Sequence, residues 1–170
     1  MKNIILTMKT SSANKQSLLL SLLIALSLVC IAGVVFFFVR MYQRDMQALT
    51  DFIASYQAFD QAIAAASAPV FTANGKSTSA ASEEELRADT ALSELKTKSS
   101  VQISSLIKNE KEAMHTMQEI SDLSDKEMST LKAYRKATGQ NANRDGLEQT
   151  FHELTKERQA VFAHFQELGR

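Results

Sequence analysis

The longest uninterrupted apolar run of the chain lies near its N-terminus, from Gln16 to Val39. Its 24 residues are mostly Leu, Ile, Val and Phe, and no charged residue falls between Lys15 and Arg40. As a helix rising about 1.5 Å per residue, the run would span about 36 Å, more than the hydrocarbon core of a bilayer at about 30 Å. The pattern therefore predicts a transmembrane helix over residues 16–39, preceded by a short tail of residues 1–15.

The length of this run favours an uncleaved signal-anchor over a cleavable signal peptide. The apolar region of a signal peptide usually has about 7–15 residues and ends at a small-x-small cleavage site. Cys30 and Ala32 have that spacing, but the apolar stretch from Gly33 to Val39 follows them. Cleavage there would leave a bare hydrophobic N-terminus, so we expect the segment to stay in the membrane.

Beyond the apolar run, polar and apolar positions recur with the period of a helix. Residues 41–68 contain no Gly and no Pro, and nothing interrupts the helix at Arg40. We therefore expect the membrane helix to continue into an amphipathic helix over 41–68, ended by Pro69 and a loop over 72–79. The expected apolar stripe consists of Met46, Leu49, Ile53, Tyr56, Ile63 and Val70, flanked by Phe52, Phe59 and Ala66.

A second helical stretch runs from Ser82 to Thr138 without Gly or Pro. Ser82 and Glu85 form a capping-box pattern at its start. As one helix the stretch would be about 85 Å long, so it should fold back on itself. Two breaks are compatible with the pattern: the polar run 108–112, which gives helices of similar length over 83–109 and 112–138, or the second capping-box pattern at 124–127.

The last amphipathic stretch follows a Gly- and Asn-rich loop at 139–146 and predicts a helix over 145–168. Four helices of similar length, joined by short loops, bury their apolar stripes most simply as an up-down antiparallel bundle. The predicted fold is all-α: a transmembrane helix of residues 16–39 continuing into a four-helix, coiled-coil-like bundle over residues 40–170.

Charge sets the expected orientation and excludes one class of partner. Lys2, Lys9 and Lys15 precede the apolar run with no acid among them, which favours an N-terminus in the cytoplasm and an extracytoplasmic bundle. From Arg40 onward the remaining 16 basic residues face all 19 acidic ones. This part has no basic patch, so we expect no nucleic-acid partner. A bacterial inner-membrane protein with a periplasmic domain fits this pattern.

Candidate catalytic and metal-binding residues are few. Glu112 and His115 form one ExxH, whereas a di-iron bundle needs two such motifs and two more Glu. His152 and His164 stand about 18 Å apart along one helix, too far to share a metal. We interpret all of these side chains as solvent-exposed. The single Cys, Cys30, forms no intrachain disulfide. The sequence therefore predicts no enzyme, no metal site and no cofactor.

Asp60 and Arg158 are the candidate site residues, because each charge falls on the spacing of an apolar stripe. A buried charge costs several kcal/mol unless it is paired. Counting residues from the membrane at both ends places Asp60 level with Thr150, about 12 Å from Arg158, so we do not expect the two to pair. Three interpretations stay open for them: a solvated bundle edge, a polar core pocket, or a polar contact across a homodimer.

In layout, with a membrane helix followed by four helices, the chain resembles the extracytoplasmic four-helix sensor module of bacterial chemoreceptors. Those receptors return through a second membrane helix to a cytoplasmic output domain, and these 170 residues hold one such apolar run. The function that we expect is an interaction or scaffold module in the cell envelope, in contact with the bilayer and with a protein partner or a second copy. The alternative, which the resemblance implies, is a ligand-sensing module that signals through a separate membrane protein.

Overall fold

The computed structural model describes residues 2–72, 82–137 and 143–168, with side chains from Leu18 onward. The regular structure of these residues is helical throughout. The helices are α1 (Lys2–Thr72), α2 (Glu83–Ser99), α3 (Glu110–Lys136) and α4 (Arg144–Leu168). The chain divides into two compact units, residues 1–43 and residues 44–170, and α1 contributes to both.

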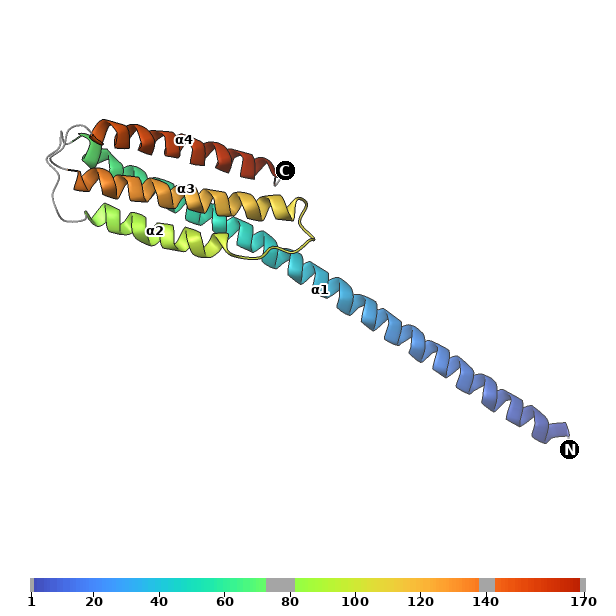
Figure 1. Ribbon diagram of the computed structural model, residues 1–170. Coiled ribbons are helices and arrows are strands. Elements are labelled where there is room, and N and C mark those ends of the chain that lie inside the picture. The colour runs from blue at the N-terminus through green and yellow to red at the C-terminus, as the bar shows by residue number, and fades with distance from the viewer. Residues whose placement is uncertain (1, 73–81, 138–142, 169–170) are drawn as a thin grey trace. The chain divides into compact units, whose positions relative to one another are not determined.

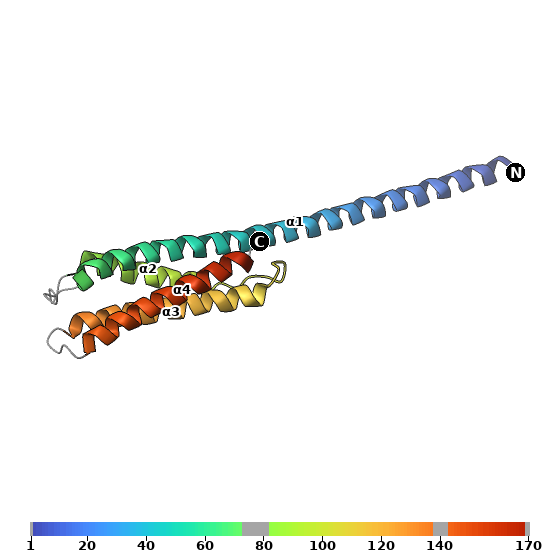
Figure 2. The same ribbon diagram turned by 90° about the horizontal axis from the view of Figure 1, so that it is seen from above.

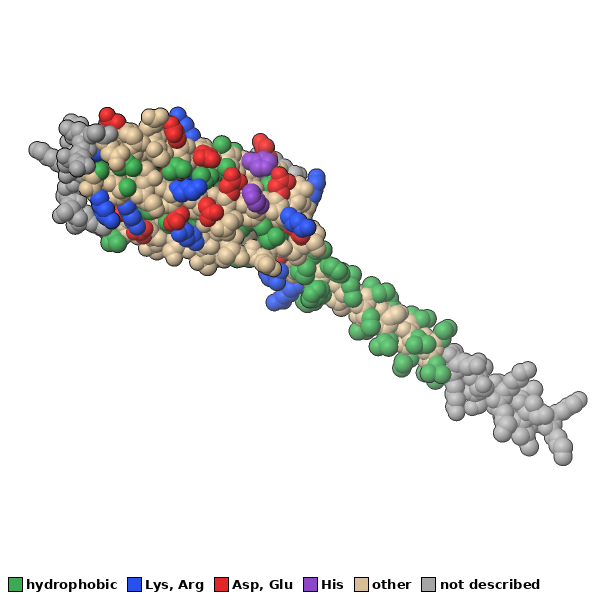
Figure 3. Space-filling model, in the orientation of Figure 1, with side chains coloured by type: hydrophobic (Ala, Val, Ile, Leu, Met, Phe, Trp, Pro, Cys, Tyr) green, Lys and Arg blue, Asp and Glu red, His purple; other side chains and the backbone are tan. Residues whose placement is uncertain are grey.

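The first unit contains the apolar run, whose described residues are exposed. Every residue from Leu18 to Arg40 is exposed, and the large apolar side chains of this segment are between 48% and 69% exposed. Figure 3 shows these hydrophobic side chains in green on all visible sides of the segment. Of the helices that the structure describes, α1 alone is long and apolar enough to cross a membrane, as a single span or as a signal-anchor.

The second unit is an antiparallel bundle of four helices, which confirms the predicted fold class. The part of α1 after Arg44 packs with α2, α3 and α4, and consecutive helices run in opposite directions (Figures 1 and 2). One apolar core runs through the unit and takes residues from all four helices.

The buried stripe of α1 lies to one side of the stripe expected from the sequence. Met46 is 41% exposed, and Leu49 and Ile53 are half-buried. Phe52 and Phe59, which were expected to flank the stripe, are fully buried at its centre, and Phe52 packs edge-on against Phe165 of α4 at a centroid distance of 5.2 Å. Tyr56 stacks on Phe162 at a centroid distance of 3.6 Å. The buried apolar residues of this part of α1 are Phe52, Tyr56, Phe59, Ile63 and Ala66.

The connection between α2 and α3 is longer than predicted, since α2 ends at Ser99 rather than at residue 109. Ser99 and Ser100 end the helix by donating their hydroxyl protons to the carbonyls of Lys96 and Thr97, at 2.9 and 2.8 Å. Serine side chains compete in this way with the helical backbone pattern. Ile103 then packs into the core and holds the loop against the bundle.

The chain turns into α3 at Asn109, whose φ of 59° lies in the left-handed region. Asparagine tolerates this conformation better than most residues do. The break therefore lies next to the polar run 108–112, the first of the two alternatives. The second alternative is wrong: Ser124 and Glu127 lie inside α3 and face the core.

The predicted capping box at the start of α2 forms in part. Ser82 accepts a hydrogen bond from the backbone N–H of Glu85 at 3.2 Å. The carboxylate of Glu85 does not return to the helix start, because it pairs with Arg135 of α3. At the same end of the bundle α1 continues to Thr72, so Pro69 lies inside the helix instead of ending it. Most of the two predicted loops, residues 73–79 and 139–142, lies outside the described residues.

Candidate functional site

The described part of the bundle carries one fully buried charged side chain on the core stripe of each helix. These are Asp45 on α1, Glu85 on α2, Glu127 on α3 and Arg158 on α4, none more than 4% exposed. Burying a charge is unfavourable by several kcal/mol unless it is paired and hydrogen-bonded. The contacts between these four residues and their partners are therefore the ones on which the stability of the core depends.

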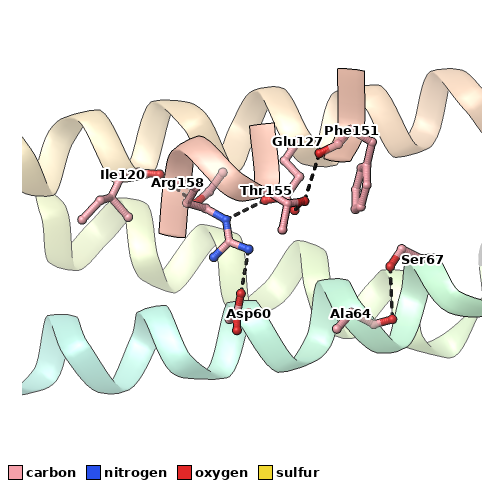
Figure 4. Close-up of polar contacts among 9 residues, drawn as sticks. Asp60, Ala64, Ser67, Ile120, Glu127, Phe151, Thr155 and Arg158 are labelled. Atoms are coloured by element: carbon pink, nitrogen blue, oxygen red, sulfur yellow. Dashed lines mark hydrogen bonds and ion pairs between the residues drawn. The ribbon is translucent and has the colours of Figure 1, made fainter. Parts of the chain in front are cut away.

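Arg158 organises the middle of the bundle. Its Nε donates a hydrogen bond to Glu127 at 2.6 Å, and its Nη2 donates one to Asp60 at 2.7 Å. Figure 4 shows the guanidinium of α4 between Asp60 of α1 and Glu127 of α3. One side chain thus connects three helices through charge-assisted hydrogen bonds, which are stronger than neutral ones.

The two carboxylates that bind Arg158 have different surroundings. Glu127 is fully buried, and its second oxygen accepts a hydrogen bond from the hydroxyl of Thr155 at 2.6 Å. The side chain of Asp60 is 38% exposed. The network holds two acids for one guanidinium, and the carboxylate that keeps contact with water lowers the desolvation cost of the excess negative charge.

Aromatic rings enclose the guanidinium. The Arg158 Cζ atom lies 5.1 Å from the centroid of Tyr56 and 5.2 Å from that of Phe59, within the range of cation–π attraction. Burial raises the pKa of Tyr56 to about 12, so its hydroxyl stays neutral beside the charges. Burial by itself would lower the pKa of Arg158, but the charge of Glu127 and the hydrogen bonds to Glu127 and Asp60 together outweigh it, and the pKa is raised.

The third guanidinium nitrogen of Arg158 is incompletely satisfied. Nη1 is buried and has no hydrogen-bond partner among the described residues. A buried donor without a partner costs about 1–3 kcal/mol. The network is therefore not optimised for stability alone, which agrees with the general finding that buried ion pairs often add little stability over apolar replacements.

The expectation that Asp60 and Arg158 lie about 12 Å apart is wrong, since they form an ion pair at 2.7 Å. That expectation placed the C-terminal end of α4 level with Arg40 of α1. Because Arg158 lies level with Asp60, the end of α4 at Leu168 lies level with Thr50, and both residues line the same cleft. The end of α4 thus lies about eight residues farther along α1 than was expected.

Asp45 forms a second polar site, which holds the loop between α2 and α3. It accepts hydrogen bonds from the backbone N–H of Ser104 at 3.0 Å, from the Ser104 hydroxyl, and from Arg44. Burial alone would raise the pKa of Asp45, but the hydrogen bonds from Ser104 and the charge of Arg44 bring the pKa below its ordinary value. The ionised carboxylate therefore binds the loop to the first turns of the bundle.

The third buried acid, Glu85, lies near the opposite end of the bundle and pairs with Arg135 of α3. Both side chains are shielded, at 5% and 16% exposure, so solvent screens the pair only weakly. An exposed pair between Lys96 and Asp125 and a partly exposed pair between Lys132 and Asp89 lie along the same two helices. Surface pairs of this kind contribute about 0–1 kcal/mol each.

Three of the four buried charges were missed at the sequence level, although one signal was present. Seven of the eleven buried residues of α3 follow one another at alternating steps of four and three, at positions 113, 117, 120, 124, 127, 131 and 134. Glu127 lies on this stripe between Ser124 and Leu131, so counting from Met117 would have placed it in the core. The resemblance of residues 124–127 to a capping box concealed this.

An apolar cleft of about 360 Å³ lies at the Asp45 end of the bundle. α1, α4 and the loop before α3 form its walls, and Lys108 is the single charged residue among those that line it. The polar lining residues are otherwise Thr50 and Gln166. The main apolar lining residues are Met46, Leu49, Ile53, Ile107, Phe165 and Leu168.

The histidines and the ExxH motif lie at the surface. The side chains of Glu112 and His115 are 55% and 82% exposed, and Glu112 contacts His164 at 3.3 Å instead of His115. His152 is also exposed, 3.9 Å from Glu148. In the ranges that the structure describes, no three His, Cys, Asp or Glu side chains are grouped so that they could hold a metal ion.

Comparison of the chain with protein-family models, with curated proteins and with solved structures finds no match in any of the three.

Proposed function

We propose that this chain is a single-pass membrane-anchored helical bundle that serves as an interaction or scaffold module in the cell envelope. One observation carries the proposal: the apolar side chains of residues 18–39 are exposed on every turn of α1. In water, an apolar surface of this length would be strongly unfavourable. In a bilayer it is matched to its surroundings, and the bundle has its own separate core.

The proposed orientation has the N-terminus in the cytoplasm and the bundle outside it, as in a periplasmic domain of a bacterial inner-membrane protein. Three lysines and no acid precede the apolar run, whereas Arg40 and Arg44 follow it. Basic residues within about 15–20 positions of a membrane helix favour the cytoplasmic side, and acids count little. The N-terminal side thus carries one basic residue more than the other side.

The absence of catalysis is part of the proposal. The polar groups in the middle of the bundle bind one another: Arg158 is enclosed by two acids and two rings, and Glu127 by Arg158 and Thr155. A catalytic group must lie within hydrogen-bond reach of a substrate. These side chains instead fill the space between the helices, which supports a structural role.

Reporter fusions at the C-terminus test the anchor and its orientation together. A periplasm-dependent enzyme fused after Arg170 should be active, and a reporter that works only in the cytoplasm should be inactive. The reverse pattern would contradict the orientation. Release of the chain from membranes by alkaline carbonate would contradict the anchor itself.

Crosslinking in intact membranes, followed by purification of the chain, tests the interaction role. We expect covalent products that contain either a second copy or one recurrent partner protein. A chain that stays uncrosslinked at every position sampled on the exposed faces of α2, α3 and α4 would contradict a scaffold function.

A ligand-sensing module that signals through a separate membrane protein is the second candidate. The cleft at the Asp45 end of the bundle favours it, because small-molecule sites are concave, mostly apolar and equipped with a few polar groups. A sensor should change its crosslinking pattern with its partner when the ligand is supplied. A scaffold should keep the same pattern.

A further inference from the structure

The cleft at the Asp45 end of the bundle has the chemistry of a site for an amphiphile. Its walls are apolar, with Leu49 and Ile53 on one side and Phe165 on another, and its volume of about 360 Å³ is near the lower end of ligand sites. A thin, flexible hydrocarbon chain fits an apolar space of this volume.

A single positive charge stands beside this apolar surface. Lys108 is exposed and forms no ion pair with an acid among the described residues, and no acid lines the cleft. A lysine near a membrane surface attracts anionic headgroups by about 1 kcal/mol. An apolar slot with a cation beside it is complementary to a molecule with an acyl chain and a negative headgroup.

The residues that line the cleft begin shortly after the apolar run in the sequence. Met46, which lines the cleft, follows Val39 by seven residues. Even a fully extended chain of that length spans at most about 25 Å. Asp45 binds Ser104 and so holds the loop that carries Ile107 and Lys108 at the same end of the bundle. Phospholipids around a membrane-inserted segment 18–39 would therefore be within reach.

We propose that this cleft binds one acyl chain of an anionic phospholipid, with the phosphate of the lipid beside Lys108. The inference rests on the proposed membrane anchoring and adds a ligand class to it. The bound lipid attaches the bundle to the membrane surface. Lys108 makes the site selective for anionic over zwitterionic headgroups.

The test uses the full chain in phosphatidylcholine nanodiscs that contain a small fraction of a phospholipid with a diazirine in its acyl chain. The photoreactive lipid is phosphatidylglycerol in one arm and phosphatidylcholine in the other. After irradiation, mass spectrometry maps the labelled residues. We expect labelling of residues 18–39 in both arms, and labelling of cleft residues such as Leu49, Ile53 or Phe165 that is at least about fivefold stronger with phosphatidylglycerol, the equivalent of about 1 kcal/mol.

Two variants with the same change of charge provide the control. Lys108→Glu should reduce phosphatidylglycerol labelling of the cleft by at least about fivefold, whereas Lys111→Glu should leave it unchanged, because Lys111 is exposed but does not line the cleft. Equal losses in both variants would overturn the assignment of the headgroup to Lys108.

The labelling pattern separates this inference from the proposal on which it rests. Labelled residues within 18–39 together with an unlabelled cleft would overturn the lipid site and leave the membrane anchor in place. No labelling of residues 18–39 would contradict the anchor, and the lipid site with it.

Discussion

The buried guanidinium of Arg158 depends on acids from two other helices, so removing one of them should be costly. We predict that Glu127→Gln destabilises the bundle by about 3–5 kcal/mol, because it leaves a buried charge without its fully buried partner. Urea unfolding of a fragment from residue 41 onward, followed by circular dichroism, measures this. Asp60→Asn is the matched control and should cost less, since Asp60 is 38% exposed and Arg158 keeps Glu127.

Removing both charges should be less harmful than removing either one. In the double variant Glu127→Leu with Arg158→Met, no uncompensated charge remains in the core, and apolar replacements of buried ion pairs are often neutral or stabilising. We expect the double variant to be more stable than Glu127→Gln by several kcal/mol, with Thr155 free to keep its bond to the Phe151 carbonyl. Additive losses in the double variant would contradict the pairing of these two side chains.

Asp45 makes the stability of the bundle depend on pH in acid. Its pKa is lower in the folded protein than its ordinary value of 3.8, so the ionised form is favoured by folding. The contribution of Asp45 is complete above about pH 3.8 and is lost as the pH falls through the lower folded pKa. The stability difference between the wild type and Asp45→Asn should therefore be constant near pH 7 and shrink below pH 4. A difference that grows in acid would contradict this assignment.

The charged residues of the core show which features of single residues can be predicted from the sequence and which cannot. Asp60 and Arg158 attracted attention because charges are unfavourable on an apolar stripe, and both belong to the buried network. Their pairing was not predicted because it depends on the position of α4 along the length of α1, and no local sequence pattern determines that position. The burial of Glu127 was not predicted because residues 124–127 match the local pattern of a helix start. In the structure, packing of the buried stripe of α3 outweighs that local pattern, and the helix continues through these residues.

At the scale of elements, the turn into α3 depends on one left-handed residue. Asn109 has a φ of 59°, where a β-carbon clashes with the backbone and β-branched residues fit worst. Asn109→Val should destabilise the bundle by about 1–2 kcal/mol, whereas Asn109→Gly should be close to neutral. Thermal unfolding of the two variants measures the difference. Equal melting temperatures would mean that the loop relaxes to another conformation.

Helix existence was more predictable than helix ends. The periodicity of residues 41–68, 112–138 and 145–168 indicated the helices that the structure contains, because each has a stripe that a neighbour buries. The end of α2 was predicted ten residues too late. Its last turns contain only Ser, Lys and Thr after Leu95, and the apolar Ile103 that suggested continuation packs into the core from the loop.

For the whole molecule, the separate core of residues 44–170 predicts that the bundle folds without the apolar run. A fragment from residue 41 to 170 should remain in solution and give a helical circular dichroism spectrum that reductant leaves unchanged, since its sequence contains no cysteine. A random-coil spectrum would show that the bundle needs the membrane segment. Helicity that appears only at high concentration would show that it forms between chains.

The position of Arg158 also limits how the bundle can move. Sliding α4 by one helical turn along its neighbours, about 5.4 Å, would break the guanidinium away from both acids and leave the buried charges of Arg158 and Glu127 unpaired in the interior. Such a displacement would be opposed by several kcal/mol, whereas bending of the bundle as a whole breaks none of these contacts. A mechanical load applied through α1 should therefore move α3 and α4 together with it, as one stiff body, and should not be absorbed by slippage between the helices.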